Sequence, residues 1–195
     1  ALTAQQGEWR ASPGVALLQA LRHRLGGQLP LIAEDLGVIT PAVEALRDRF
    51  RLPGMKILQF AFDGNAANAY LPENYVGHHW VVYTGTHDNA TCIGWWDSLP
   101  EDQRRQVGER IGQMIEAPGW QLLELALASR AELAVVPLQD LLSLGDHARF
   151  NTPGTAGEAN WSWRLEQPVE QLSETIAALA ALAARYGRAA AGGTR

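Results

Sequence analysis

Two carboxylic acids in this sequence directly follow apolar segments, where parallel α/β proteins place the groups that do chemistry. Glu34 ends the run at residues 29–34 (LPLIAE), and Asp88 lies in the stretch 84–89 (TGTHDN) after the run 79–83 (HWVVY). Glutamate is a poor helix cap, and partial burial of Glu34 would favour its protonated form, which suits a general acid. Glycoside chemistry requires two carboxyl groups that face one pocket. The pair therefore favours a glycoside-processing site.

The other polar residues that follow apolar runs have structural explanations beside the chemical one. Asp35 and Asp140 more often cap a helix, because aspartate at a strand–helix junction accepts backbone N–H bonds. The dipeptide Asp-Gly at 63–64 is an ordinary turn sequence. The segment 87–89 (HDN) could itself form an Asx turn whose histidine bonds a neighbour. A structural and a chemical role both stay open for it.

Several of the seven tryptophans adjoin polar loops, namely Trp95, Trp96, Trp161 and Trp163. Aromatic rings have flat apolar faces that suit amphipathic ligands such as sugars. Core packing explains these four residues equally well, whereas Trp80 and Trp120 are expected to pack in the core.

Apolar runs bounded by turn residues predict short strands that alternate with helices. The expected strands are residues 29–34, 54–62, 79–83 and 133–136. Ser12-Pro13 and Thr40-Pro41 each predict a helix start, and further helices are expected near residue 93 and at residues 101–115, 120–130, 138–144 and 169–186. This alternation predicts the α/β class with a parallel sheet, whose carboxyl ends gather the polar residues at one edge.

Composition excludes several classes of function. The net charge of −5, without a basic cluster, argues against a nucleic-acid partner. Cys92 is the single cysteine, so no internal disulfide is possible. The longest apolar run, residues 176–184, is less than half of the roughly 20 residues that span a bilayer. No signal peptide opens the sequence, so we expect no membrane association and a cytoplasmic location. No metal site is expected, because His78, His79, His87 and Asp88 lack a recognised ligand spacing.

Five motifs occur in a fixed order along the chain: IAEDLG (32–37), GMKILQFAF (54–62), YTGTHDNAT (83–91), ARFNTPGT (148–155) and NWSWR (160–164). Together they resemble the C-terminal part of the 4-α-glucanotransferases, the amylomaltase or disproportionating enzyme family. The resemblance covers about residues 29–165, with a weaker match at GEWR (7–10). It implies a (β/α)8 barrel enzyme that moves α-1,4-glucan segments between maltooligosaccharides with retention of configuration. It also implies that no metal or organic cofactor takes part.

The resemblance further implies roles for individual residues. Glu34 corresponds to the general acid/base of the family. Asp88 corresponds to the carboxylate that stabilises the transition state, and it must stay ionised, which hydrogen bonds from its neighbours would favour. The implied substrate-binding residues are His87 at a sugar hydroxyl, Phe60 and Asp63 on the acceptor side, and Asn151 and Asn160 near the donor side.

One family motif does not occur in this sequence. The covalent nucleophile of the family is an aspartate in an RxDH motif, and retention requires a nucleophile. The chain has 195 residues, whereas a complete barrel typically needs about 250. We therefore expect the C-terminal half of a TIM barrel with about four parallel strands, inactive without the N-terminal half as its partner. The expected parts are a helix at 1–28, the half-barrel at 29–165, and a packing helix with a frayed tail at 166–195. A non-catalytic glucan-binding module and a starch hydrolase of related barrel type are the alternatives.

Overall fold

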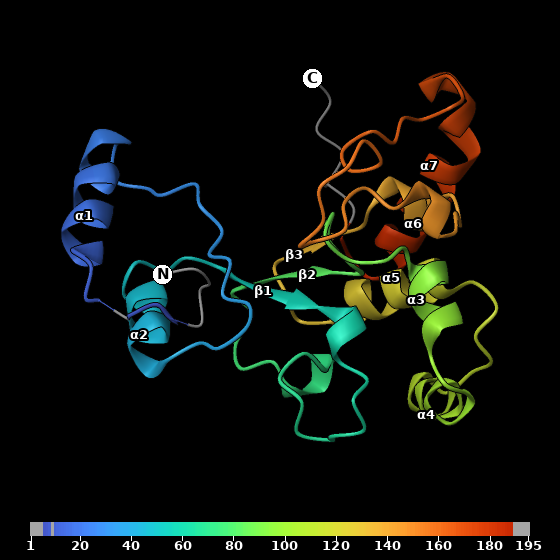
Figure 1. Cartoon of the computed structure of the whole chain (residues 1–195), viewed down its shortest axis with the longest axis horizontal. Coiled ribbons are helices and arrows are strands. Elements are labelled where there is room, and N and C mark those ends of the chain that lie inside the picture. The colour runs from blue at the N-terminus through green and yellow to red at the C-terminus, as the bar shows by residue number, and fades with distance from the viewer. Residues whose placement is uncertain (1–5, 9, 189–195) are drawn as a thin grey trace. The chain divides into compact units, whose positions relative to one another are not determined.

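Two units make up the chain, residues 1–54 and 55–195. The computed structural model describes residues 6–8 and 10–188 (Figure 1). The predicted frayed tail falls on residues 189–195, which lie outside the described residues. The predicted division at residues 28 and 165 stays a prediction.

The first unit contains two helices, α1 (Gly14–Arg24) and α2 (Pro41–Arg49). The predicted start of α2 is confirmed, since Thr40 is its N-cap and a proline occupies its first position. The two helices are in close contact, because a Cβ atom added to Gly14 would lie 2.8 Å from Leu46 Cδ2. The guanidinium of Arg22 on α1 also lies 5.5 Å from the centre of the Phe50 ring.

The strand predicted at residues 29–34 is wrong. The segment is extended, and Ala33 donates a backbone hydrogen bond of 2.9 Å to the Pro53 carbonyl, but no ladder forms there. Leu31 and Ile32 are 39% and 46% exposed, so the segment is not buried on both faces. A strand exists only where a neighbour supplies a regular set of hydrogen bonds, and an apolar run does not specify that neighbour.

The second unit is built on a three-stranded sheet in the order β1-β2-β3. The strands are β1 (Gly54–Ile57), β2 (Trp80–Tyr83) and β3 (Leu133–Val135). β2 and β3 are parallel, with Val82 opposite Ala134. The predicted α/β class is thus confirmed, with three strands rather than four in the described part of the chain. The strand predicted at 54–62 ends early, because the backbone turns into a 3-10 helix, η2 (Leu58–Phe60).

Helices follow each strand of the second unit. They are α3 (Cys92–Ser98), α4 (Glu101–Ile111), α5 (Pro118–Ala128), α6 (Leu138–Leu141) and α7 (Ser173–Arg185), with the short 3-10 helices η3 (Pro72–Asn74), η4 (Asp146–Ala148) and η5 (Val169–Leu172). α4 ends earlier than predicted because Gly112 adopts a left-handed conformation, which favours glycine.

The guanidinium of Arg188, shortly after α7, binds the carboxyl-terminal end of α5 and the residues that follow it. It donates hydrogen bonds to the carbonyls of Leu127, Ser129 and Ala131 at 2.7, 2.7 and 2.6 Å. Carbonyls at the end of a helix lack partners within the helix. Arg188 therefore satisfies groups that α5 leaves open.

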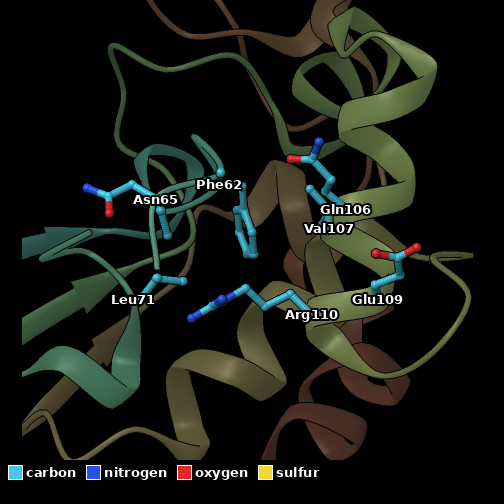
Figure 2. Close-up of a pocket in the computed structure, with 9 residues that line it drawn as sticks. Phe62, Asn65, Leu71, Gln106, Val107, Glu109 and Arg110 are labelled. Atoms are coloured by element: carbon cyan, nitrogen blue, oxygen red, sulfur yellow. The ribbon is translucent and has the colours of Figure 1, made fainter. Parts of the chain in front are cut away.

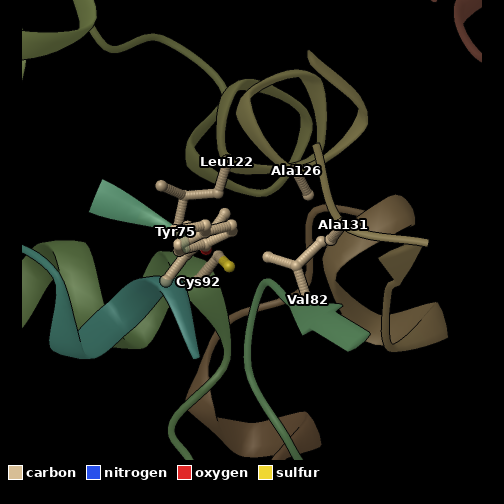
Figure 3. Close-up of a cluster of buried hydrophobic side chains, with 7 residues drawn as sticks. Tyr75, Val82, Cys92, Leu122, Ala126 and Ala131 are labelled. Atoms are coloured by element: carbon tan, nitrogen blue, oxygen red, sulfur yellow. The ribbon is translucent and has the colours of Figure 1, made fainter. Parts of the chain in front are cut away.

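The core of the second unit forms around α5, which packs against β2, β3, α3 and α6 (Figure 1). Its central cluster consists of Leu58, Tyr75, Val82, Cys92, Leu122, Ala126 and Ala131, most of them labelled in Figure 3. Cys92 is completely buried, and burial raises the pKa of its thiol well above the ordinary value. The residue is a core side chain and not a reactive nucleophile.

Asp140 is a buried carboxylate that joins three elements of this unit. It is 2% exposed. Its Oδ2 accepts a hydrogen bond from the Thr84 hydroxyl after β2, and its Oδ1 accepts one from the Cys92 amide at the start of α3, both at 2.7 Å. Asp140 thus accepts a backbone N–H bond as predicted, but the amide belongs to the first residue of α3, whose N-cap is Thr91, and not to its own helix, α6.

Gly119 is required by the close approach of α5 to the backbone of Asp140. A Cβ atom at position 119 would lie 2.4 Å from the Asp140 carbonyl oxygen. We expect Gly119→Ala to lower the free energy of unfolding by about 1–3 kcal/mol, because backbone cannot move aside as a flexible side chain can. Urea denaturation monitored by circular dichroism measures this change.

Gly108 in α4 is the matched control for this prediction. A Cβ atom there would make only an ordinary contact of 3.5 Å with the Gln113 carbonyl oxygen. Gly108→Ala should leave stability unchanged or raise it by up to about 1 kcal/mol, because alanine is the better helix former. Equal effects of the two substitutions would contradict the role assigned to Gly119.

Candidate functional site

Three of the predicted site residues meet at the loop that follows β2. The Asn151 side-chain amide donates a hydrogen bond of 2.6 Å to Asp88 Oδ1, and His87 Nε2 lies 3.4 Å from the same oxygen. The side chains of His87 and Asp88 are 55% and 48% exposed, so a ligand can reach both. The arrangement combines a carboxylate, an imidazole and an amide within hydrogen-bond reach of one another.

Backbone hydrogen bonds fix the two loops that carry these residues. The Asn151 amide donates to the His87 carbonyl at 3.1 Å. Arg149 joins the loops a second time, because its Nη2 donates to the Asp88 carbonyl and its Nε to the Asn151 carbonyl, both at 2.9 Å. Within the first loop, the Thr86 hydroxyl accepts a bond of 3.3 Å from the Asp88 amide. The position of Asp88 is therefore set by several independent bonds.

An aromatic pair lies beside the imidazole. The ring of Trp161 is 5.1 Å from that of His87, and it meets the ring of Phe150 edge-on, also at 5.1 Å. Trp161 has a backbone φ of 63°, which is strained for a bulky residue and costs about 1–3 kcal/mol. Spacing along the sequence gave no signal for this contact.

Asn160 holds the loop between Asn151 and Trp161 in shape. Its side-chain oxygen accepts a bond of 3.0 Å from the Thr152 amide, and its side-chain nitrogen donates to the Thr155 carbonyl at 3.2 Å. These bonds give Asn160 a structural role in this loop. Contact between Asn160 and a sugar stays a prediction.

Phe60 and Asp63 follow β1, the strand next to β2 in the sheet. The Phe60 ring is 45% exposed and meets the Tyr70 ring edge-on at 5.5 Å. Hydrogen bonds from the Asn68 side chain and from the Asn65 amide lower the pKa of Asp63 below its ordinary value. The Asp63 carboxylate accepts the Asn65 bond at 2.9 Å, as the turn explanation of residues 63–64 requires. A ligand-binding role for either residue stays a prediction.

Glu34 belongs to the first unit, unlike the other predicted site residues. Its side chain is exposed, so the predicted partial burial is wrong for this chain. The side chain of the adjacent Asp35 is only 7% exposed and forms an ion pair of 2.5 Å with Arg47 on α2. This ion pair anchors the segment that presents Glu34.

A separate pocket of about 380 Å³ opens between the loop after β1 and helix α4. Figure 2 shows the Phe62 ring pointing between Leu71 and Val107, with the side chain of Arg110 below it. None of the predicted site residues lines this pocket, although Phe62 and Gly64, the two sequence neighbours of Asp63, do. Arg110 also pairs with Glu73, which keeps its guanidinium at the pocket wall.

No group of three or more His, Cys, Asp or Glu side chains in residues 6–8 and 10–188 could hold a metal ion. Over the same residues, no helix has the length and apolar character needed to cross a membrane.

The family whose sequence model matches residues 1–170 is described as 4-alpha-glucanotransferase. A 4-alpha-glucanotransferase from Synechocystis sp. PCC 6803 is 49% identical to the chain over 188 residues, which cover 95% of the chain. One from Thermus thermophilus is 47% identical over 189 residues and covers 93%. The chain spans only 37% of the length of each of these relatives.

Solved structures agree with the sequence comparisons. The amylomaltase from Streptococcus agalactiae in complex with acarbose has a TM-score of 0.87 and 32% sequence identity. The match covers 96% of this chain and 38% of that amylomaltase. The α/β arrangement of a small parallel sheet with its helices therefore matches part of an amylomaltase structure.

Proposed function

Because the chain belongs to the 4-alpha-glucanotransferase family, we propose that it carries part of the site that moves α-1,4-glucan segments between maltooligosaccharides. The main support is the contact of Asp88 with His87 and Asn151, which lie in two separate motifs of the family. A retaining transfer passes through an oxocarbenium-like transition state, and an exposed carboxylate that is fixed in place can stabilise the positive charge that develops there.

Each remaining residue has a proposed part in this reaction. Glu34 protonates the leaving glycosidic oxygen and later takes a proton from the attacking hydroxyl. His87 and Asn151 hold sugar hydroxyls beside Asp88. Phe60 and Asp63 bind the acceptor, and Asn160 contacts a sugar on the donor side. The nucleophile that retention requires would come from outside this sequence, since no RxDH motif occurs in it.

We further propose that residues 29–165 are the C-terminal half of a (β/α)8 barrel. β3 lies at the edge of the sheet, and its Leu133 and Val135 are 49% and 36% exposed. An apolar edge strand favours pairing with a further strand, as barrel closure would provide. The predicted parts at 1–28, 29–165 and 166–195 fit this proposal, with the N-terminal half of the barrel as the partner.

A hybrid enzyme tests the proposed function. In it, this chain replaces the matching 188 residues of the Synechocystis relative. We expect the hybrid to convert maltotriose into glucose and longer chains, and the 195-residue chain alone to show no conversion. Chromatography of the labelled oligosaccharides measures both. Conversion by the chain alone would contradict the claim that the chain lacks the nucleophile. An inactive but folded hybrid would contradict the proposed function.

The same product analysis separates the alternatives. A related starch hydrolase would give mainly shorter products, and a glucan-binding module would bind maltotriose without conversion. No observation on the chain favours either over transfer. A cytoplasmic location and the lack of a nucleic-acid partner stay predictions.

A further inference from the structure

The backbone of Trp161 is strained, with a φ of 63°. Glycine or asparagine normally occupies this left-handed region, because a Cβ atom crowds the following carbonyl there. Strain of this kind persists only where surrounding contacts impose it. The contacts that hold Trp161 in this strained conformation therefore indicate the role of the residue.

Phe150 provides these contacts. The Trp161 amide donates a hydrogen bond of 2.7 Å to the Phe150 carbonyl, and the two rings meet edge-on. Asn160, the residue before Trp161, is bonded within its own loop to Thr152 and Thr155. The direction of the indole ring is thus fixed from both its own backbone and its neighbours.

Core packing does not explain the strained position. Trp161 remains 53% exposed, so much of its apolar ring is in contact with water. The rest of the ring is packed beside His87, which adjoins the Asp88 carboxylate. The strain therefore presents a rigid aromatic surface next to the polar groups of the site.

We propose that Trp161 stacks on a glucose ring of the glucan chain that His87 and Asp88 contact. This inference rests on the proposed function, and it selects sugar binding from the two explanations that the sequence left open for Trp161. A pyranose ring has an apolar face of C–H groups and a rim of hydroxyls. An indole suits the apolar face, while His87, Asp88 and Asn151 offer hydrogen-bond partners to the rim.

Binding of maltoheptaose to the 195-residue chain tests the stacking, measured by saturation-transfer NMR titration. We expect Trp161→Ala to raise the Kd about tenfold, and Trp161→Phe to raise it about two- to threefold, because phenylalanine keeps a smaller aromatic face. Ser162→Ala is the matched control. Ser162 is the next residue and bonds only locally, to the Ala159 carbonyl among the described contacts, so its substitution should leave the Kd unchanged.

Trp161→Gly separates sugar binding from a role in folding. Glycine adopts the left-handed backbone without strain, so this variant should have a higher melting temperature than Trp161→Ala. Both variants should lose the same affinity, because both lack the ring. An unchanged Kd for Trp161→Ala would overturn the stacking alone. A folded chain that binds no maltoheptaose would overturn the stacking together with glucan binding by this part of the site.

Discussion

Asp88→Asn is expected to lower the transfer activity of the hybrid enzyme by roughly a thousandfold or more. The substitution keeps the size of the side chain and removes its negative charge. Asn151 and His87 already fix the carboxylate, so the lost activity would come from the charge rather than from a displaced loop. Initial rates of glucose release from maltotriose measure the effect.

Asp97→Asn is the control for this substitution. Asp97 is an exposed aspartate on α3, and we expect its replacement to leave the rate unchanged. Circular dichroism should show the same fold for both variants. An Asp88→Asn hybrid that keeps more than about a tenth of the activity would contradict a transition-state role for Asp88, since removal of one stabilising group typically costs a hundredfold or more.

Asp140→Ala is expected to lower the free energy of unfolding by about 3 kcal/mol. The substitution leaves the Thr84 hydroxyl and the Cys92 amide, both buried, without their acceptor. A buried polar group that loses its partner costs more than an average hydrogen bond contributes. Asp140→Asn should cost less, because one carbonyl oxygen remains to accept the Cys92 bond. Urea denaturation of the 195-residue chain measures both values.

A double-mutant cycle with Thr84→Val isolates the bond between Thr84 and Asp140. We expect the double variant to be more stable than the sum of the two single losses predicts, because the unsatisfied hydroxyl is removed together with its acceptor. Asp97→Ala, at an exposed position, should change stability by less than about 0.5 kcal/mol. A change in the free energy of unfolding of less than about 0.5 kcal/mol for Asp140→Ala would refute the structural role of the buried carboxylate.

The elements that the sequence predicted well are those with local signals. Thr40-Pro41 marks the start of α2. The boundaries predicted for β2 and β3 from the apolar runs differ from the observed ones by at most one residue. The segment at 29–34 has the same apolar character but forms no strand, because a ladder depends on a neighbour that local composition does not encode.

In the candidate site too, local features could be predicted from the sequence and long-range contacts could not. His87 and Asp88 are adjacent in the sequence, so their proximity could be expected. Their contact with Asn151 depends on loops 63 positions apart, and only the family motifs linked these two segments. The left-handed conformation of Trp161 could not be predicted at all, since residue type argues against it.

The hydrogen bonds between Arg188 and the end of α5 limit how far the chain can be shortened from its carboxyl terminus without loss of these contacts. One guanidinium satisfies carbonyls of Leu127, Ser129 and Ala131, which belong to the region leading from α5 into β3. A stop codon placed just before position 188 removes all three bonds together. A shortened gene must therefore retain Arg188 if the carbonyls at the end of α5 are to keep these partners.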